Sequence, residues 1–173
     1  MFRMLALVCA LGIAVAVRPA LAQQQSASPP APVSTATLPY GPPVTLDQAK
    51  RAMAAAELEA VKNSWQVAIS ILDSGGNLVI FHKIDNTQLS AVEAAEGKAR
   101  TALQFKRASK ALDDAIAAGG AGLRLLAVKD ITPLEGGLPI LIDGKIIGAI
   151  GVSGALSSQD AQVAKAGADA LAK

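Results

Sequence analysis

Residues 137–154, GLPILIDGKIIGAIGVSG, constrain the fold of this chain more than any other stretch. Two apolar runs flank the Asp-Gly pair at 143–144. Such a pair between β-branched runs is typical of a β-hairpin, because the tight turn needs positive φ at both central positions. The second run contains Gly148, Gly151 and Gly154. Since glycine weakens a strand, these glycines predict that another backbone, a helix or a ligand approaches closely.

The first 22 residues predict an export signal. Arg3 precedes an apolar stretch that runs from Met4 to Val17, and residues 20–22, Ala-Leu-Ala, match a small-x-small cleavage site. The apolar stretch is shorter than the roughly 20 residues of a membrane-spanning helix, so an uncleaved anchor is the weaker alternative. We expect cleavage before Gln23, a periplasmic or secreted location, and no membrane attachment of the mature protein.

Cysteine usage and charge exclude several classes of protein. The only cysteine, Cys9, lies within the predicted signal. The mature chain would therefore have no disulfide, thiolate metal site or covalently attached c-type haem. Without Arg3 and Arg18, the 16 Lys and Arg residues become 14, which equals the 14 Asp and Glu residues. A neutral chain without a basic patch predicts no nucleic-acid partner.

The mature chain divides into a linker and one domain. Residues 23–43 are rich in Gln, Ser, Ala and Pro, and six of the nine prolines fall between Pro29 and Pro43. This composition predicts an extended or disordered spacer. Residues 44–173 have a length that suits a single domain with one core.

The remaining patterns predict an α+β domain. Thr45 and Gln48 form a capping box, the turn at 73–76 joins two alternating apolar runs, and Gly119-Gly120 is a helix stop. In addition to the hairpin, we expect strands at 65–72, 77–83 and 123–128, and helices at 46–62, 89–105, 110–118 and from 157 to the end. Strands joined mainly by hairpins favour an antiparallel sheet, here of five strands, with helices packed around it.

Four motifs in order resemble the GlcG/HbpS family of haem-binding proteins. They are DSGGNLV at 73–79, KARTALQF at 98–105, GGLPI at 136–140 and GAIGVSG at 148–154, and the likeness continues through Asp160 and 166–170. The resemblance implies a profilin-like fold, a five-stranded antiparallel sheet flanked by helices. It also implies non-covalent binding of haem or a related tetrapyrrole, and a homo-oligomer. One departure is Lys83-Ile84-Asp85-Asn86, where many relatives have Arg-Met-Asp-Gly, so the resemblance does not extend to a carboxylate or propionate contact of that arginine.

Few side chains of the mature chain could ligate haem iron. Iron is held by His, Cys, Met or Tyr, and the mature sequence offers only His82, Met53 and Tyr40. His82 is the leading candidate, because it stands late in a predicted strand on the same face as two apolar residues. The alternative is a strand-end histidine that is solvated or hydrogen-bonded.

Three more polar residues are candidates for cofactor binding. Lys98 and Thr101 lie within a matched family motif, so Lys98 could pair with a propionate and Thr101 could approach a bound macrocycle. Glu135 precedes the Gly-Gly pair at 136–137 and could line a pocket. The alternatives are helix-packing roles for Lys98 and Thr101 and a solvated loop carboxylate for Glu135.

The sequence leaves enzymatic activity open, with little to favour it. A Ser-His-Asp site would have to use His82, and no phosphate-binding Gly-Lys-Ser/Thr motif is present.

The predicted helices favour self-association of the domain, because their small side chains bury little apolar area per residue. We therefore expect an exported, oligomeric haem-binding protein in haem storage, sensing or degradation. The alternative is a small-molecule-binding or catalytic protein of glycolate-type organic acid catabolism.

Overall fold

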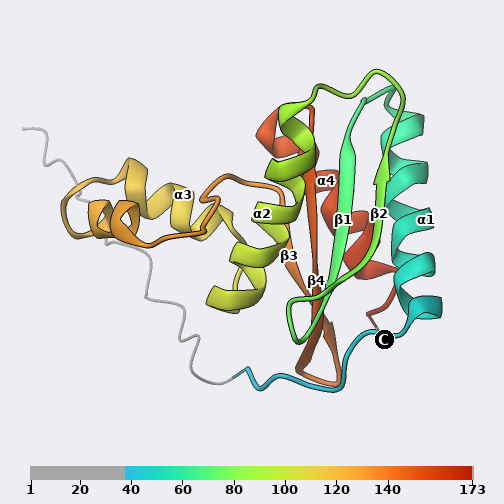
Figure 1. Ribbon diagram of the computed structural model, residues 1–173, viewed down its shortest axis with the longest axis horizontal. Coiled ribbons are helices and arrows are strands. Elements are labelled where there is room, and N and C mark those ends of the chain that lie inside the picture. The colour runs from blue at the N-terminus through green and yellow to red at the C-terminus, as the bar shows by residue number, and fades with distance from the viewer. Residues whose placement is uncertain (1–37, 173) are drawn as a thin grey trace, which may run out of the picture. The chain divides into compact units, whose positions relative to one another are not determined.

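The computed structural model describes residues 38–172. The predicted export signal and most of the predicted linker lie outside these residues. Four strands form one antiparallel sheet in the order β2-β1-β4-β3, built from β1 (Ala68–Asp73), β2 (Leu78–Lys83), β3 (Gly137–Ile142) and β4 (Lys145–Ser153) (Figure 1). The predicted α+β class and antiparallel pairing are confirmed, and β2 and β3 are the sheet edges.

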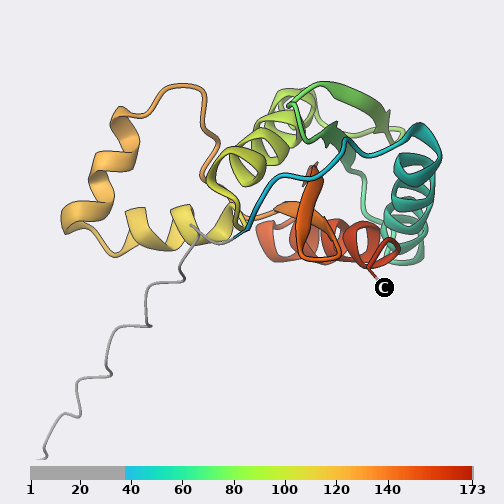
Figure 2. The ribbon, with the colours of Figure 1, turned by 90° about the horizontal axis from the view of Figure 1, so that it is seen from below.

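The helices cover both faces of the sheet. On one face lies α2 (Ser90–Phe105), and on the other lie α1 (Leu46–Lys62) and α4 (Ser157–Asp169), which pack against each other (Figure 2). The predicted capping box begins α1, where Thr45 accepts from the Gln48 amide and the Gln48 side chain accepts from the Thr45 amide. None of the helices within residues 38–172 is long and apolar enough to cross a membrane.

The prediction of a fifth strand at 123–128 is wrong. This segment belongs to a 3-10 helix, η2 (Gly120–Ala127), which follows α3 (Lys110–Ala117). Its Leu, Arg and Ala residues favour helical conformations, and only Val128 of the predicted strand is β-branched. Gly122 allows the segment to fold back on α3, because a Cβ there would lie 1.8 Å from the Ala115 carbonyl oxygen.

The second hairpin forms as predicted, and the elements that pack against it explain why it contains glycines. The Asp143 and Gly144 φ angles are 50° and 70°, as the tight turn requires. A Cβ on Gly151 would lie 2.0 Å from the Ala95 carbonyl oxygen of α2 and 2.5 Å from the Ala99 amide nitrogen. Glycine at this position therefore lets the backbone of α2 lie directly on β4.

The core has one part on each face of the sheet. Alternation along β1 places Ile69 and Ile71 toward α1 and α4, and Leu72 toward α2. The larger part also contains Met53, Ile140, Ile150, Val152 and Val163. Alanines of α2 dominate the smaller part, as the small side of this helix predicts.

The segment before α1 packs on the domain. The Tyr40 hydroxyl donates to the Leu103 carbonyl oxygen at 2.9 Å, and the Lys106 ammonium lies 4.3 Å from the centre of the Tyr40 ring. Lys106 also donates to the Leu38 carbonyl oxygen at 2.9 Å. Tyr40 therefore fastens this segment to the end of α2.

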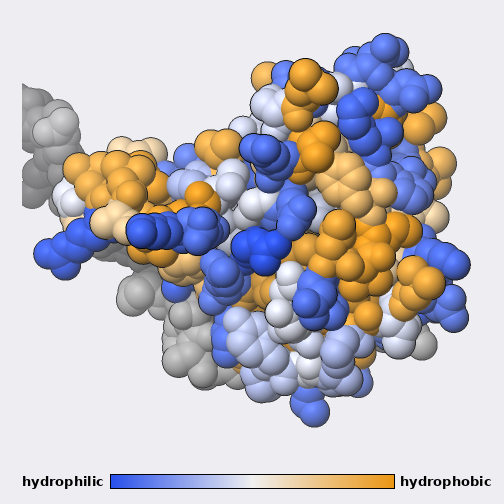
Figure 3. Space-filling view, viewed as in Figure 1, coloured by the Kyte–Doolittle hydropathy of each residue, from blue (hydrophilic) through white to orange (hydrophobic). Residues whose placement is uncertain are grey.

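The α3–η2 arm, residues 110–127, lies to one side of the sheet and the other helices (Figures 1 and 2). No residue of η2 is buried, and Leu123 and Leu126 are 49% and 67% exposed. Apolar surface gathers on this arm and also over β1 and β2 beside α2 (Figure 3). The arm therefore presents leucine side chains to solvent.

Candidate functional site

His82 lies near the end of the edge strand β2 and pairs with a carboxylate of α1. Its Nδ1 is 2.5 Å from Oε1 of Glu57. Both side chains are accessible, with 44% of His82 and 36% of Glu57 exposed. Since the carboxylate accepts the Nδ1 proton, the tautomer that this bond favours leaves a lone pair on Nε2. His82 is thus accessible, oriented and equipped to ligate a metal.

Apolar side chains accompany Glu57 on the outer side of α1. Ala54, Leu58 and Val61 are spaced to share one face of the helix with Glu57. Leu58 is 70% exposed and Val61 is 66% exposed. The imidazole of His82 is therefore bonded to a helix face that also presents apolar surface to solvent.

Lys98 lies in a different environment, inside the protein between α2, β4 and α4. Its ammonium donates to Oδ2 of Asp160 at 2.8 Å and to the Val152 carbonyl oxygen at 3.0 Å. Both charged side chains are 2% exposed. Burial raises the pKa of the Asp160 carboxyl, while the hydrogen bond from Lys98 acts in the opposite direction. The Lys98 ammonium is engaged within the fold, so the predicted contact with a propionate gains no support.

Thr101 is buried and holds a loop against α2. Its hydroxyl donates to the Gly97 carbonyl oxygen at 2.8 Å and accepts from the Thr132 amide at 2.7 Å. The loop can lie this close because residue 97 is glycine: a Cβ there would be 2.2 Å from Oγ1 of Thr132. Thr101 therefore shapes the wall of a neighbouring pocket, and its hydroxyl is occupied by backbone groups.

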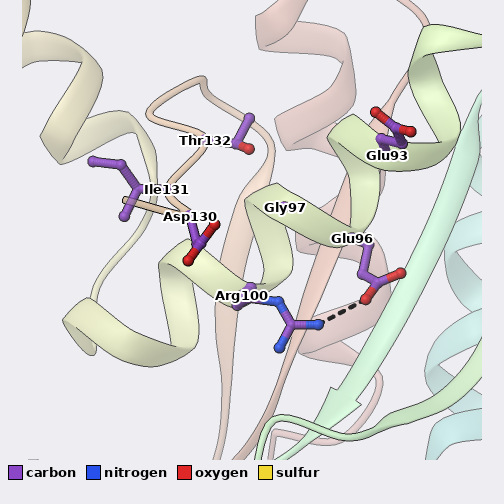
Figure 4. Close-up of a pocket in the computed structure, with 7 residues that line it drawn as sticks. All are labelled: Glu93, Glu96, Gly97, Arg100, Asp130, Ile131 and Thr132. Carbon is purple, nitrogen blue, oxygen red and sulfur yellow. Dashed lines mark hydrogen bonds and ion pairs between the residues drawn. The ribbon is translucent and has the colours of Figure 1, made fainter. Parts of the chain in front are cut away.

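That pocket lies between α2 and the loop at 130–132 (Figure 4). Its volume is about 330 Å³, and it is lined by Glu93, Glu96, Gly97, Arg100, Asp130, Ile131 and Thr132. Glu96 and Arg100, four residues apart on α2, form an ion pair at 2.7 Å. Asp130 has a φ angle of 60°, which is uncommon for a residue other than glycine. The lining is polar, with three carboxylates and one guanidinium.

Glu135 lines a separate pocket of about 200 Å³ between the start of α3, the start of β3 and α4. Lys110 and Lys165 also line this pocket, and each pairs with an aspartate of its own helix. A further pocket of about 480 Å³ is lined by Gln48, Arg51, Ile142, Asp143, Ala170 and Leu171. Glu135 therefore does line a pocket, although none of the other three predicted site residues lines it.

The structure does not bring the four predicted site residues together. His82 lies on the edge strand β2 beside α1, Lys98 and Thr101 lie on α2, and Glu135 lies in the loop just before β3. None of the three pockets is lined by His82, Met53 or Tyr40. Within residues 38–172, no group of three or more His, Asp or Glu side chains could hold a metal ion.

Sequence reasoning missed the partner of His82. Glu57 is 25 residues away in sequence, and no local motif marks it. In the sequence, Glu57 looks like an ordinary solvated glutamate on a helix, four residues before the apolar Val61. Only the packing of α1 beside β2 identifies the pair.

Comparison with known proteins relates this domain to haem proteins. The family model described as haem degrading protein HbpS-like matches residues 44–169. Protein GlcG of Escherichia coli strain K12 is 42% identical over 101 residues, which cover 58% of this chain and 74% of GlcG. The crystal structure of HbpS superposes with a TM-score of 0.70 at 30% identity, covering 79% of this chain and 95% of HbpS.

A second solved structure contains the cofactor. The crystal structure described as a PduOC:heme complex superposes with a TM-score of 0.68 at 28% identity, covering 74% of this chain and 94% of that one. The predicted resemblance thus has support from sequence and from fold, over nearly all of the described domain. The chain belongs to the HbpS-like family.

Proposed function

We propose that this protein is an exported haem-binding protein that holds haem, or a related tetrapyrrole, without a covalent bond. The observation that carries the proposal is His82, an accessible imidazole whose Nδ1 is held by Glu57 at 2.5 Å. Membership of the HbpS-like family and the fold shared with the PduOC:heme complex support the choice of ligand. Haem storage, sensing and degradation are all compatible with such a site.

The donor set of the described residues fits this ligand. Of the three side chains that could ligate iron, Met53 is 1% exposed and the Tyr40 hydroxyl is bonded to the Leu103 carbonyl oxygen. His82 alone of these three combines exposure with a ring nitrogen left for a metal. The exposed Leu58 and Val61 add apolar surface on the helix that carries Glu57. Bound haem would supply iron chemistry, and His82 would hold and orient it.

We further propose that the protein is a homo-oligomer. Leu123 and Leu126 are exposed on the α3–η2 arm, and Leu89 is 88% exposed next to the start of α2. Large exposed apolar patches mark interaction surfaces more often than monomer surfaces. Gel filtration with light scattering at micromolar concentration measures the mass directly, and a monomer would contradict this part of the proposal.

The export part of the proposal depends on the first 22 residues. Cleavage before Gln23 would release a mature chain without cysteine into the periplasm or medium. Expression of the full chain, followed by cell fractionation and mass spectrometry of the N-terminus, tests this step. A full-length protein that stays with the cytoplasmic fraction would contradict it.

Titration with haemin tests ligand binding. The purified protein should give a saturable shift of the Soret band, and His82→Ala should weaken the affinity at least about tenfold, as loss of a ligand requires. Tyr40→Phe is the matched control, because Tyr40 is the other exposed candidate ligand within residues 38–172, and this variant should bind haemin like the wild type. A wild-type protein with no spectral change at tens of micromolar haemin would overturn the proposal. Calorimetric binding of glycolate by that same protein would favour the small organic acid alternative.

A further inference from the structure

The bond between His82 and Glu57 joins two elements that are otherwise held by apolar packing. Glu57 lies in α1, and His82 lies in β2 on the adjacent sheet edge. Exposed ion pairs add little to stability, because water and salt screen the two charges. The pair contributes little to the fold, yet the contact of Nδ1 with the carboxylate favours one rotation and one tautomer of the ring.

We infer that Glu57 is a positioning residue for His82, acting on haem iron only through the imidazole. The inference rests on the proposed function and adds a specific role within it. Metal-ligating histidines commonly donate their second ring N–H to a carboxylate, which orients the ring and makes the other nitrogen a stronger donor. Here the 2.5 Å separation between Nδ1 and Oε1 supplies this arrangement before any ligand binds.

A stronger donor nitrogen has a predictable effect on bound iron. Negative charge shared with the imidazole stabilises ferric iron relative to ferrous iron, so Glu57 should lower the midpoint potential of the bound haem. It should also increase haemin affinity, because less free energy is spent on orienting a ring that is already held. A purely structural ion pair would have neither effect.

Glu59 provides a matched control on the same helix. It carries the same charge two residues away, but its carboxylate accepts from Gln162 at 2.5 Å and from Asn63 at 3.0 Å, on a different side of α1. Glu59→Gln therefore removes one negative charge from α1 without touching the imidazole. Any general effect of charge on haemin binding will be present in both variants.

The first measurement uses the protein without haem. Nitrogen-15 chemical shifts of the His82 ring should show the Nδ1–H tautomer in the wild type and in Glu59→Gln. In Glu57→Ala they should show a mixture with the Nε2–H tautomer, because nothing then holds the proton on Nδ1. Unchanged ring shifts in Glu57→Ala would overturn the inference without involving haem.

The second measurement uses haemin. Glu57→Ala and Glu57→Gln should weaken haemin affinity by about 10- to 100-fold and raise the midpoint potential of the bound haem, with Glu59→Gln close to the wild type. If His82→Ala weakens binding while both Glu57 variants bind like Glu59→Gln, the positioning role is wrong and the proposed function stands. If His82→Ala binds like the wild type, the role of Glu57 is wrong as well. If the wild type binds no haemin, the proposed function itself fails.

Discussion

Two ion pairs among the described residues, Lys98–Asp160 and His82–Glu57, join distant elements and differ sharply in their surroundings. Lys98 and Asp160 join α2 to α4 in the interior, at 2% exposure, with backbone groups that complete their hydrogen bonding. His82 and Glu57 join β2 to α1 at the surface, at 44% and 36% exposure. The buried pair has no access to a ligand, whereas the exposed pair contributes little to the fold and is accessible to one. Burial, more than residue type, separates the structural pair from the pair proposed to bind haem.

The largest expected effect is on the buried pair. Asp160→Ala leaves the Lys98 ammonium buried without its carboxylate, so the free energy of unfolding should fall by about 3–5 kcal/mol. Urea denaturation followed by circular dichroism measures the loss. The double variant Lys98→Met with Asp160→Leu should recover most of it, because no unpaired charge remains. A loss below about 1 kcal/mol in Asp160→Ala would show that the buried pair does not hold α4 in place.

A second test concerns the close contact of α2 with β4 beside the buried pair. Gly151→Ala places a methyl group 2.0 Å from the Ala95 carbonyl oxygen, so α2 must shift, with a cost of about 1–3 kcal/mol. The control is Gly75→Ala in the turn between β1 and β2, where a Cβ meets only side-chain atoms, at 3.1 Å and beyond. Equal melting temperatures for the two variants would mean that α2 and β4 are not tightly packed against each other.

The exposed pair should show the opposite balance between stability and binding. Glu57→Ala should change the free energy of unfolding by no more than about 1 kcal/mol. The same variant is expected to lose haemin affinity by about 10- to 100-fold. Thermal unfolding and haemin titration of one preparation compare the two quantities. A large loss of stability with unchanged affinity would reverse the assignment of the two pairs.

The smallest expected effect is a pH dependence in the turn between β1 and β2. Burial acts to raise the pKa of the Asp73 carboxyl, but hydrogen bonds from Asn77 and from the Gly75 amide outweigh it, and the net pKa lies below 3.8. The folded state thus binds the proton less tightly than the unfolded chain. The stabilisation is therefore present above pH 3.8 and is lost as the pH falls through the folded-state pKa.

The Asp73 effect is measured as the difference in unfolding free energy between the wild type and Asp73→Asn. This difference should shrink as the pH falls from about 5 to about 2, because the carboxyl is protonated first in the unfolded chain and only at lower pH in the folded state. A difference that stays constant across the range would show that these hydrogen bonds do not favour the ionised carboxyl.

Local signals in the sequence predicted most of the fold. The capping box at Thr45, the tight turn at 143–144 and the stop at Gly119-Gly120 each depend on neighbouring residues, and each forms as expected. The prediction of a strand at 123–128 was wrong, because its leucines suit a helix or a strand. The packing of Gly122 on α3 decides between the two. The predicted five-stranded sheet accordingly has four strands.

The candidate site was less predictable, because its defining contacts join residues far apart in sequence. Lys98 is 62 residues from Asp160, and the sequence indicated only that both residues lie in stretches that resemble the family. His82 could be proposed by elimination, since few residues of the mature chain ligate haem iron. Its bond to Glu57 depends on how α1 packs beside β2, which no local pattern specifies.

Mapping the bound haem by nuclear magnetic resonance tests the central claim most directly. Ferric haem is paramagnetic and broadens the signals of amides close to the iron. With substoichiometric haemin, we expect selective broadening at residues 80–83 of β2 and residues 54–61 of α1, and its loss in His82→Ala. Broadening centred instead on residues 93–100 and 130–132, around the polar pocket of α2, would contradict binding through His82.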